Sequence, residues 1–347
     1  MNCHLRALIL ILPLAAITGC ASPVYYFQAV SGQLEILNKR RPVEEVLSDP
    51  ATPPQTRQQL TLVRRLRDFA SQELGLPDNP SYRSYADLER PFVIWNVFAT
   101  PELSLKPRQW CFVFAGCVSY RGYFARDKAE RFATDMKQGG YDTYVGGVPA
   151  YSTLGWLNDP VLNTFINRSE ADLAGLLFHE LAHQVVYVGG DSAFNESFAT
   201  VVELEGVQRW FGRHGTAPQA EAYRQKIRRR EQFIALVLKH KAKLAGIYTS
   251  NLGVAEKRAA KKRIFGELRN DYAALKTDWG GHSDYDKWSE QDLNNAHLAA
   301  IGMYHQYVAA FQKLLRQQGD DLKNFYRAAR QMANLPRDER RMALQNF

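Results

Sequence analysis

The stretch LLFHELAHQVVYVGGDSAFNESFATVVELEG, residues 176–206, predicts two helices joined by a tight turn. The turn is signalled by Gly189-Gly190-Asp191, three residues that commonly interrupt helices. We expect the first helix to run from Asp172 to Val188 and the second from Ser192 to Trp210. Apolar residues flank the histidines of the first helix, which indicates that most of this helix is buried.

The pattern His-Glu-x-x-His in this stretch predicts a metal site. His179 and His183 are four residues apart, so they lie on one helix face and could bind the same ion. Glu180 would lie beside a metal-activated water and act as the catalytic base, as in zinc hydrolases. Glu196 follows the turn closely enough for the chain to reverse and supply a third ligand. Glu203, seven residues further on the same helix face, is either an acceptor that orients a ligand histidine or part of a surface salt bridge.

We therefore predict one catalytic Zn²⁺ bound by His179, His183 and Glu196, with a fourth position open. The alternative is a metal-free pair of helices whose polar side chains satisfy one another, but two buried imidazoles without partners would be costly. A longer zinc pattern with a third histidine would require Gly at position 186 and His at position 189. The chain has Val186 and Gly189, which excludes that pattern.

The first twenty residues, MNCHLRALILILPLAAITGC, predict export from the cytoplasm. A basic start at Arg6 precedes an apolar run that is too short to span a bilayer, which is typical of a signal peptide over residues 1–19. Ile17-Thr18-Gly19-Cys20 resembles the bacterial lipobox, and this resemblance implies lipidation of Cys20. Because Ala21 is not aspartate, we expect the outer membrane of a Gram-negative envelope, facing the periplasm. The alternative is an ordinary secretory signal with a chance cysteine.

This compartment bears on the remaining cysteines and on the partners. Cys111 and Cys117 would form a disulfide in an oxidising space, the alternative being two small buried hydrophobic residues. The chain has a net charge of +8, which becomes +7 when residues 1–19 leave with one arginine. Such a charge permits contact with anionic lipid or envelope polymers. An exported protein has little access to nucleic acid, so we expect no nucleic-acid partner.

The sequence predicts an α+β fold that is mainly helical. Residues 56–76 have the spacing of an amphipathic helix, and β-prone runs at 92–100, 110–124 and 141–153 predict a small antiparallel sheet, with a helix between the last two. The segment 146–156 could be an edge strand that binds a substrate backbone or ordinary sheet. We expect five parts in the chain: the signal peptide 1–19, a tether and N-terminal segment 20–55, the sheet with the metal-site helices 56–215, a helical hairpin 216–280, and C-terminal helices 281–347.

The helical hairpin and the C-terminal helices leave two points open. The hairpin, with helices at 217–246 and 254–276, is either a solvated surface or a lid over a cleft. An apolar helix around residues 294–315 could supply a hydrogen-bond donor for a reaction oxyanion. Tyr304 and His297 are the candidates for this donor, Tyr248 is a weaker one, and ordinary packing is the alternative for each.

The motifs together resemble known families. FHELAHQ followed by NESFA looks like the gluzincin metallopeptidases, which implies a thermolysin-like two-helix zinc site beside a sheet. The wider chain, including WNVFATPELSL and WCFVFAGCVSYRGYF, resembles a bacterial lipoprotein family described as predicted aminopeptidases. This resemblance implies peptide substrates. The Gly-x-Met-Glu-Asn amine-binding motif of well-known zinc aminopeptidases is absent, so an envelope endopeptidase and a non-enzymatic assembly or chaperone lipoprotein with a structural zinc remain alternatives. The oligomeric state is not predicted.

Overall fold

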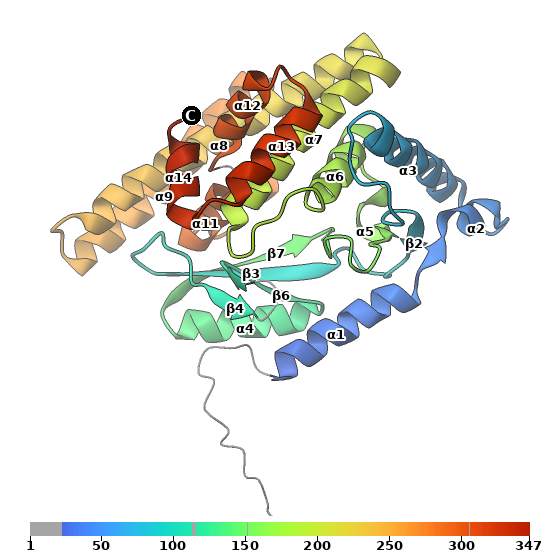
Figure 1. Cartoon of the computed structure of the whole chain (residues 1–347). Helices are drawn as coiled ribbons and strands as arrows, with labels where there is room; N and C mark the ends of the chain where they lie inside the picture. Colours follow the sequence, from blue (N-terminus) through green and yellow to red (C-terminus); the bar gives the residue numbers. More distant parts are fainter. Residues whose placement is uncertain (1–22, 113–115, 151, 305) are drawn as a thin grey trace, which may run out of the picture.

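The computed structural model describes residues 23–112, 116–150, 152–304 and 306–347 (Figure 1). The predicted signal peptide 1–19 and the predicted lipidation site Cys20 lie outside the described residues. Among the described helices, none is long and apolar enough to cross a membrane. The described chain is α+β and mainly helical, as predicted.

Fourteen helices occur in the described part of the chain: α1 Pro23–Asn38, α2 Val43–Ser48, α3 Pro54–Gln72, α4 Arg126–Gln138, α5 Asn163–Ile166, α6 Glu170–Ala182, α7 Ser192–His214, α8 Ala217–Thr249, α9 Val254–Asp278, α10 Asp286–Ser289, α11 Asn295–Tyr304, α12 Val308–Gln317, α13 Leu322–Ala333 and α14 Arg337–Gln345. The strands of the same part are β1 Arg41–Pro42, β2 Ser84–Ala86, β3 Ile94–Pro101, β4 Trp110–Phe112, β5 Gly116–Val118, β6 Arg121–Tyr123, β7 Tyr141–Val148 and β8 Val161–Leu162.

The central sheet has the order β6-β3-β7 and is antiparallel throughout. Side chains of β3 alternate between its two faces, as the strand period requires. Trp95 and Val97 pack towards α4, whereas Phe98 packs with Ala296 and Ala300 of α11. In Figure 1 α1 and α4 lie on one side of this sheet, and the metal-site helices and the C-terminal helices lie on the other.

Two smaller sheets accompany the central one. β4 and β5 pair antiparallel, and Cys111 lies directly opposite Cys117 in their register. The two sulfurs form a disulfide, so the predicted Cys111–Cys117 bridge is confirmed. The other small sheet has the order β1-β2-β8, and its β2–β8 pair is parallel, which the prediction of an antiparallel sheet did not include.

The helical hairpin is confirmed as α8 and α9, each somewhat longer than predicted. A capping box at Thr216 and Gln219 begins α8. Phe233 and Val237 of α8 pack with Ile264 of α9 in a core of their own. The hairpin therefore buries an apolar interface in addition to exposing a charged surface.

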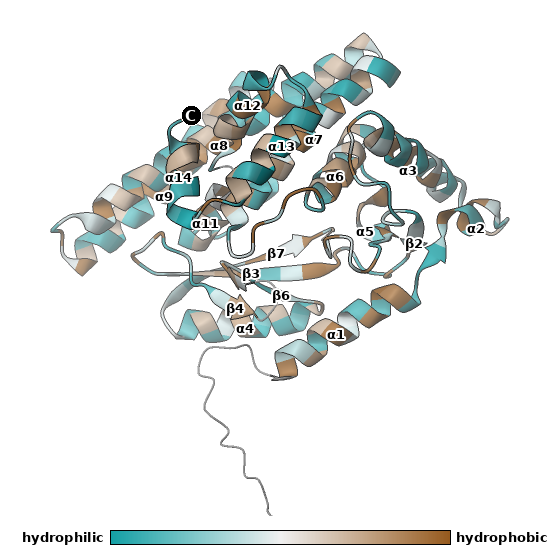
Figure 2. Cartoon of the chain, in the orientation of Figure 1, coloured by the Kyte–Doolittle hydropathy of each residue, from teal (hydrophilic) through white to brown (hydrophobic). Residues whose placement is uncertain are grey.

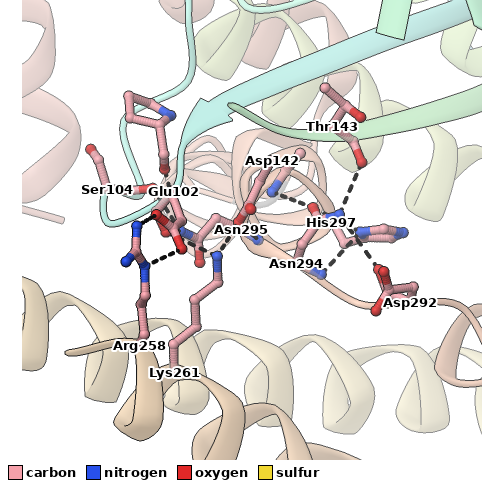
Figure 3. Close-up of polar contacts among 12 residues, drawn as sticks. Glu102, Ser104, Asp142, Thr143, Arg258, Lys261, Asp292, Asn294, Asn295 and His297 are labelled. Carbon is pink, nitrogen blue, oxygen red and sulfur yellow. Dashed lines mark hydrogen bonds and ion pairs between the residues drawn. The ribbon is translucent and has the colours of Figure 1, made fainter. Parts of the chain in front are cut away.

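A polar cluster fixes this hairpin to the end of the sheet (Figure 3). Arg258 of α9 makes two hydrogen bonds of 2.8 Å to the carboxylate of Glu102, and Lys261 donates to Asp142 at 2.6 Å. Asn295, which is fully buried at the start of α11, donates to the carbonyl oxygens of Glu102 and Ser104 at 2.8 and 3.0 Å. The cluster joins α9, α11 and the loop after β3 in one network.

Several predicted helix ends differ by up to four residues, as in α3 and α7, and two differences are larger. α6 ends at Ala182 rather than at Val188. Gln184 and Val185 bond to carbonyl oxygens three residues earlier, which makes tight turns, and the backbone groups of Val188 bond to the side chain of Asn195. The apolar helix predicted around 294–315 is two helices, α11 and α12. The predicted tether segment also contains α1, which packs against the rest of the chain.

Candidate metal centre

Helices α6 and α7 position the candidate metal centre. Ser169 caps α6 by accepting a hydrogen bond from the backbone N–H of Asp172, and Asp191 caps α7 in the same way through Phe194. His179 lies in the last turn of α6, and His183 is the residue that follows the helix. Their ring centroids are 4.9 Å apart, so both imidazoles face the same region.

Asn195 closes the turn between these helices. Its side-chain oxygen accepts a hydrogen bond from the N–H of Val188 at 2.8 Å, and its amide donates to the carbonyl oxygen of Val188 at 2.9 Å. Gly190 has a φ of +77°, a conformation that favours glycine. The clamp therefore holds the reversed chain in place, and Glu196, the next residue, returns opposite the histidines.

The structure brings His179, His183 and Glu196 together. One ligand atom from each lies within 4.8 Å of the other two. Nε2 of His179 is 3.2 Å from Oε2 of Glu196, and Nε2 of His183 is 3.9 Å from Oε1 of the same carboxylate. Zinc bonds of about 2.1 Å in a tetrahedral site place donors roughly 3.4 Å apart, so a small adjustment would accommodate the ion. Nδ1 of His183 is buried and has no hydrogen-bond partner among the residues that the structure describes.

Glu203 contacts the imidazole nitrogen of His179 that does not face Glu196, and Arg230 binds Glu203. Oε2 of Glu203 lies 3.1 Å from Nδ1 of His179, and its other oxygen accepts a hydrogen bond of 2.8 Å from Arg230 of α8. The sequence analysis gave two roles for Glu203, and the contact with His179 corresponds to the first, an acceptor that orients a histidine. The sequence did not single out Arg230 as the partner of Glu203. Arg230 also connects the helical hairpin to the centre, because it lies on α8.

The pKa values of the two histidines at the centre are shifted in opposite directions. Burial lowers the pKa of His179, but the carboxylates of Glu196 and Glu203 outweigh this effect and raise it to about 10. Burial lowers the pKa of His183 to about 4. Without a metal, two carboxylates thus hold a proton on one imidazole. A divalent cation bound by His179, His183 and Glu196 would take the place of this proton as the positive charge beside the buried carboxylates. The donor set therefore fits zinc.

Glu180 lies at the wall of a cavity of about 490 Å³, together with His179 and Glu203. Residues of α8, together with Asp284 and Tyr285, also line this cavity. Burial raises the pKa of Glu180 to about 7, which the positive charge on His179 partly opposes. A carboxyl group with this pKa is suited to exchanging protons near neutral pH. The volume is in the range of small-molecule sites.

His297 and Tyr248, which the sequence suggested as oxyanion donors, contact residues at the end of the sheet. His297 is hydrogen-bonded within its own segment to Asn294 and Gln291, and its ring packs on Tyr144, 4.3 Å away between centroids. None of these contacts is with a metal-centre residue, and Figure 3 shows His297 in the cluster at the sheet end. Tyr248 donates to Asn295 in that cluster. The side chain of Tyr304 lies outside the described part of the chain.

Tyr120, between β5 and β6, is a residue that the sequence did not single out. Burial, followed by the negative charge of Glu196, raises its pKa above the usual range, and Glu180 also contributes. Close approach of Gly116 to the Gly190 turn brings this segment to the centre, since a Cβ on Gly116 would lie 3.2 Å from the nitrogen of Gly190. The sequence signal was only a β-prone run, which does not indicate where a tyrosine between strands will point.

An α+β fold with two histidines and a glutamate converging beside a cavity has the features of a candidate metallohydrolase. A family model described as "Putative aminopeptidase" matches residues 24–344, and the chain belongs to that family. The predicted resemblance to this family is thereby confirmed. Neither the curated proteins nor the solved structures contain a match to the chain. Membership indicates an enzyme with peptidase activity, whereas the gluzincin type of the site and the lipid anchor stay predictions.

Proposed function

We propose that the protein is a zinc-dependent peptidase, and by its family an aminopeptidase, that hydrolyses peptide substrates in the periplasm. The proposal is supported chiefly by one observation: His179, His183 and Glu196 converge within 4.8 Å, and Glu180 lies next to them at the cavity wall. A purely structural zinc site has no use for a carboxylate poised beside an open ligand position.

Each residue at the centre would have a separate role in the reaction. His179, His183 and Glu196 would bind the ion, which when bound polarises water and the scissile carbonyl group. Glu180 would accept a proton from the attacking water at a carboxylate oxygen and pass it to the leaving nitrogen. Tyr120 would donate a hydrogen bond from its phenol to the oxygen on which negative charge develops. Glu203, held by Arg230, would keep Nδ1 of His179 protonated and its Nε2 free for the metal.

The decisive experiment compares the wild-type protein with Glu180→Gln. We expect one zinc per chain in both, measured by elemental analysis. Hydrolysis of a peptide library should fall by about 10²- to 10⁴-fold in the variant, because the base is lost and the ligands are kept. Glu205→Gln, on α7 and ion-paired with Arg209, is the control and should be fully active. Bound zinc without Glu180-dependent cleavage would instead support a structural zinc in an assembly or chaperone protein.

The same assay separates the two peptidase alternatives. An aminopeptidase requires a free amino terminus, so acetylation of the substrate should abolish cleavage. An endopeptidase should cleave the acetylated peptides equally well. Mass spectrometry of the products from matched free and acetylated peptides reads out this difference directly.

We propose further that lipid on Cys20 anchors the protein to the outer membrane, facing the periplasm. The support is the sequence MNCHLRALILILPLAAITGC, in which the cysteine follows a short apolar run. Mass analysis of the mature N-terminus should show a diacylated or triacylated Cys20. The variant Cys20→Ser should lose this mass, and an unmodified cysteine in the wild-type protein would refute the anchor.

A further inference from the structure

The outward face of α1 is mainly apolar, with Ser31 and Asn38 as its exposed polar residues. Val24, Phe27, Val30 and Leu34 recur at helical spacing, and each is between 51% and 76% exposed. The helix has one charged residue, Glu35, which forms an ion pair with Arg90. In Figure 2 hydrophobic residues mark α1 although it lies at the edge of the molecule. The exposed stripe has no partner among the described residues.

The opposite face of α1 is firmly packed, so the stripe cannot turn inward. Gln28 is buried and hydrogen-bonds the backbone of Gly122 and Phe124. Gly32 lies directly against Phe124, where a Cβ would come within 2.1 Å of the ring. Ile36 is buried in the main core. Rotation of the helix would break these contacts, and the apolar face is therefore a fixed feature of the surface.

An exposed tryptophan lies in a loop that contacts the chain just beyond the C-terminal end of α1. Trp156 is 82% exposed. Its loop is tied to the chain just after α1 by Arg40, two residues past the end of the helix, which donates to the carbonyl oxygens of Leu157 at 2.8 Å and Asn158 at 3.3 Å. Exposed tryptophans beside apolar helix faces and arginine are typical of membrane-surface binding.

The chain before α1 indicates which partner covers the face. Only two residues separate Cys20 from Pro23, the first residue of α1, and such a segment spans about 10 Å at full extension. A lipid on Cys20 therefore holds α1 at the bilayer surface. We propose that the outward face of α1, together with Trp156, lies in the interfacial region of the anchoring bilayer. This inference rests on the proposed anchor, and it adds a second membrane contact that orients the protein.

The orientation has a consequence for the metal centre. A Cβ on Gly155, the neighbour of Trp156, would lie 3.0 Å from the side-chain oxygen of Gln184. Gln184 directly follows the ligand His183. The loop that carries the tryptophan therefore also contacts the residue next to a candidate metal ligand, and membrane binding of this loop would act on the metal centre through Gln184.

Vesicle binding without the lipid tests the proposal. A chain of residues 20–347 with Cys20→Ser contains every residue that the structure describes and has no anchor. It should co-sediment with vesicles of phosphatidylethanolamine and phosphatidylglycerol, and Val30→Asp should weaken this binding about tenfold. Val254→Asp is the matched control, since Val254 on the hairpin is 56% exposed and Val30 is 58% exposed. Circular dichroism verifies that both variants fold.

A second measurement uses the lipidated protein in vesicles that contain brominated lipid. Trp156 fluorescence, obtained as the difference between wild type and Trp156→Phe, should be quenched. Absence of both vesicle binding and quenching, or equal weakening by Val30→Asp and Val254→Asp, would overturn the proposal. A dimer that Val30→Asp dissociates would assign the face to a second copy instead. Peptide hydrolysis without vesicles and the mass of Cys20 report separately on the proposed activity and anchor.

Discussion

Replacing Glu203 by Gln should weaken zinc binding without altering the fold. The carboxylate of Glu203 lies between His179 and Arg230, at 3.1 and 2.8 Å. Burial raises the pKa of Glu203, but Arg230 and His179 outweigh this effect and lower it to about 2, so the group is ionised at neutral pH. Glutamine keeps the shape and one acceptor oxygen, and only the charge is removed.

The size of the effect follows from the hydrogen bond to His179. A hydrogen bond to a charged group contributes about 1.5–3 kcal/mol, and a neutral one about 0.5–1.5 kcal/mol. The difference of roughly 1–1.5 kcal/mol corresponds to about tenfold in affinity. Glu203→Ala also removes the acceptor and leaves Arg230 without its carboxylate. We expect the zinc affinity of that variant to fall about 100-fold, which is the upper end of the effect of groups that orient metal ligands.

Competition with a chromophoric chelator at pH 7.5 measures the zinc affinity directly. Glu205→Gln is the matched control, because Glu205 lies on the same helix, is 19% exposed where Glu203 is 18% exposed, and pairs with Arg209 away from the histidines. It should bind zinc as the wild type does. If Glu203→Gln also binds zinc with unchanged affinity, Glu203 does not orient His179 and the argument from the contact is wrong.

Three further predictions concern the centre and its support. Tyr120→Phe should lower kcat about 100-fold with little change in KM, and an unchanged kcat would exclude the phenol as oxyanion donor. Zinc affinity should rise about tenfold per pH unit between pH 6 and 8, because zinc displaces one proton from His179, whose pKa in the metal-free centre is about 10; a flat chelator titration would contradict this. Asn295→Ala should cost about 3 kcal/mol of stability, since it removes the buried amide that bonds the carbonyl oxygens of Glu102 and Ser104 and accepts from Tyr248. Thermal unfolding measures this loss, the exposed Asn251→Ala is its control, and equal melting temperatures for both variants would refute the estimate.

Local patterns in the sequence predicted the helices but not all of their ends. The hairpin, α3 and the two metal-site helices follow from apolar spacing and from the Gly189-Gly190 turn. The early end of α6 comes from tight turns at Gln184 and Val185, after which the side chain of Asn195 bonds both backbone groups of Val188. Such a side-chain clamp across a turn leaves no periodic signal, and the prediction consequently ran to Val188.

Contacts between segments far apart in the chain could not be predicted from the sequence. The spacing of His179, His183 and Glu196 is local and could be recognised, because two adjacent helices carry all three. Tyr120 comes from a different part of the chain, and its position depends on how the sheet packs against the helices. Arg230 reaches Glu203 only because α8 folds back along α7, and a charge-rich helix has no mark that distinguishes one arginine from its neighbours.

The hairpin is better understood as part of the scaffold than as a lid. Near the centre, Arg230 of α8 binds the carboxylate that supports His179. At the sheet end, Lys261 of α9 binds Asp142, and both helices share an apolar core. Opening such a hairpin as a rigid body would separate a partly buried ion pair close to the candidate metal ligands and break the polar cluster at the same time. Both contacts therefore oppose opening of the whole hairpin, and loss of the Arg230–Glu203 contact should alter the position of His179.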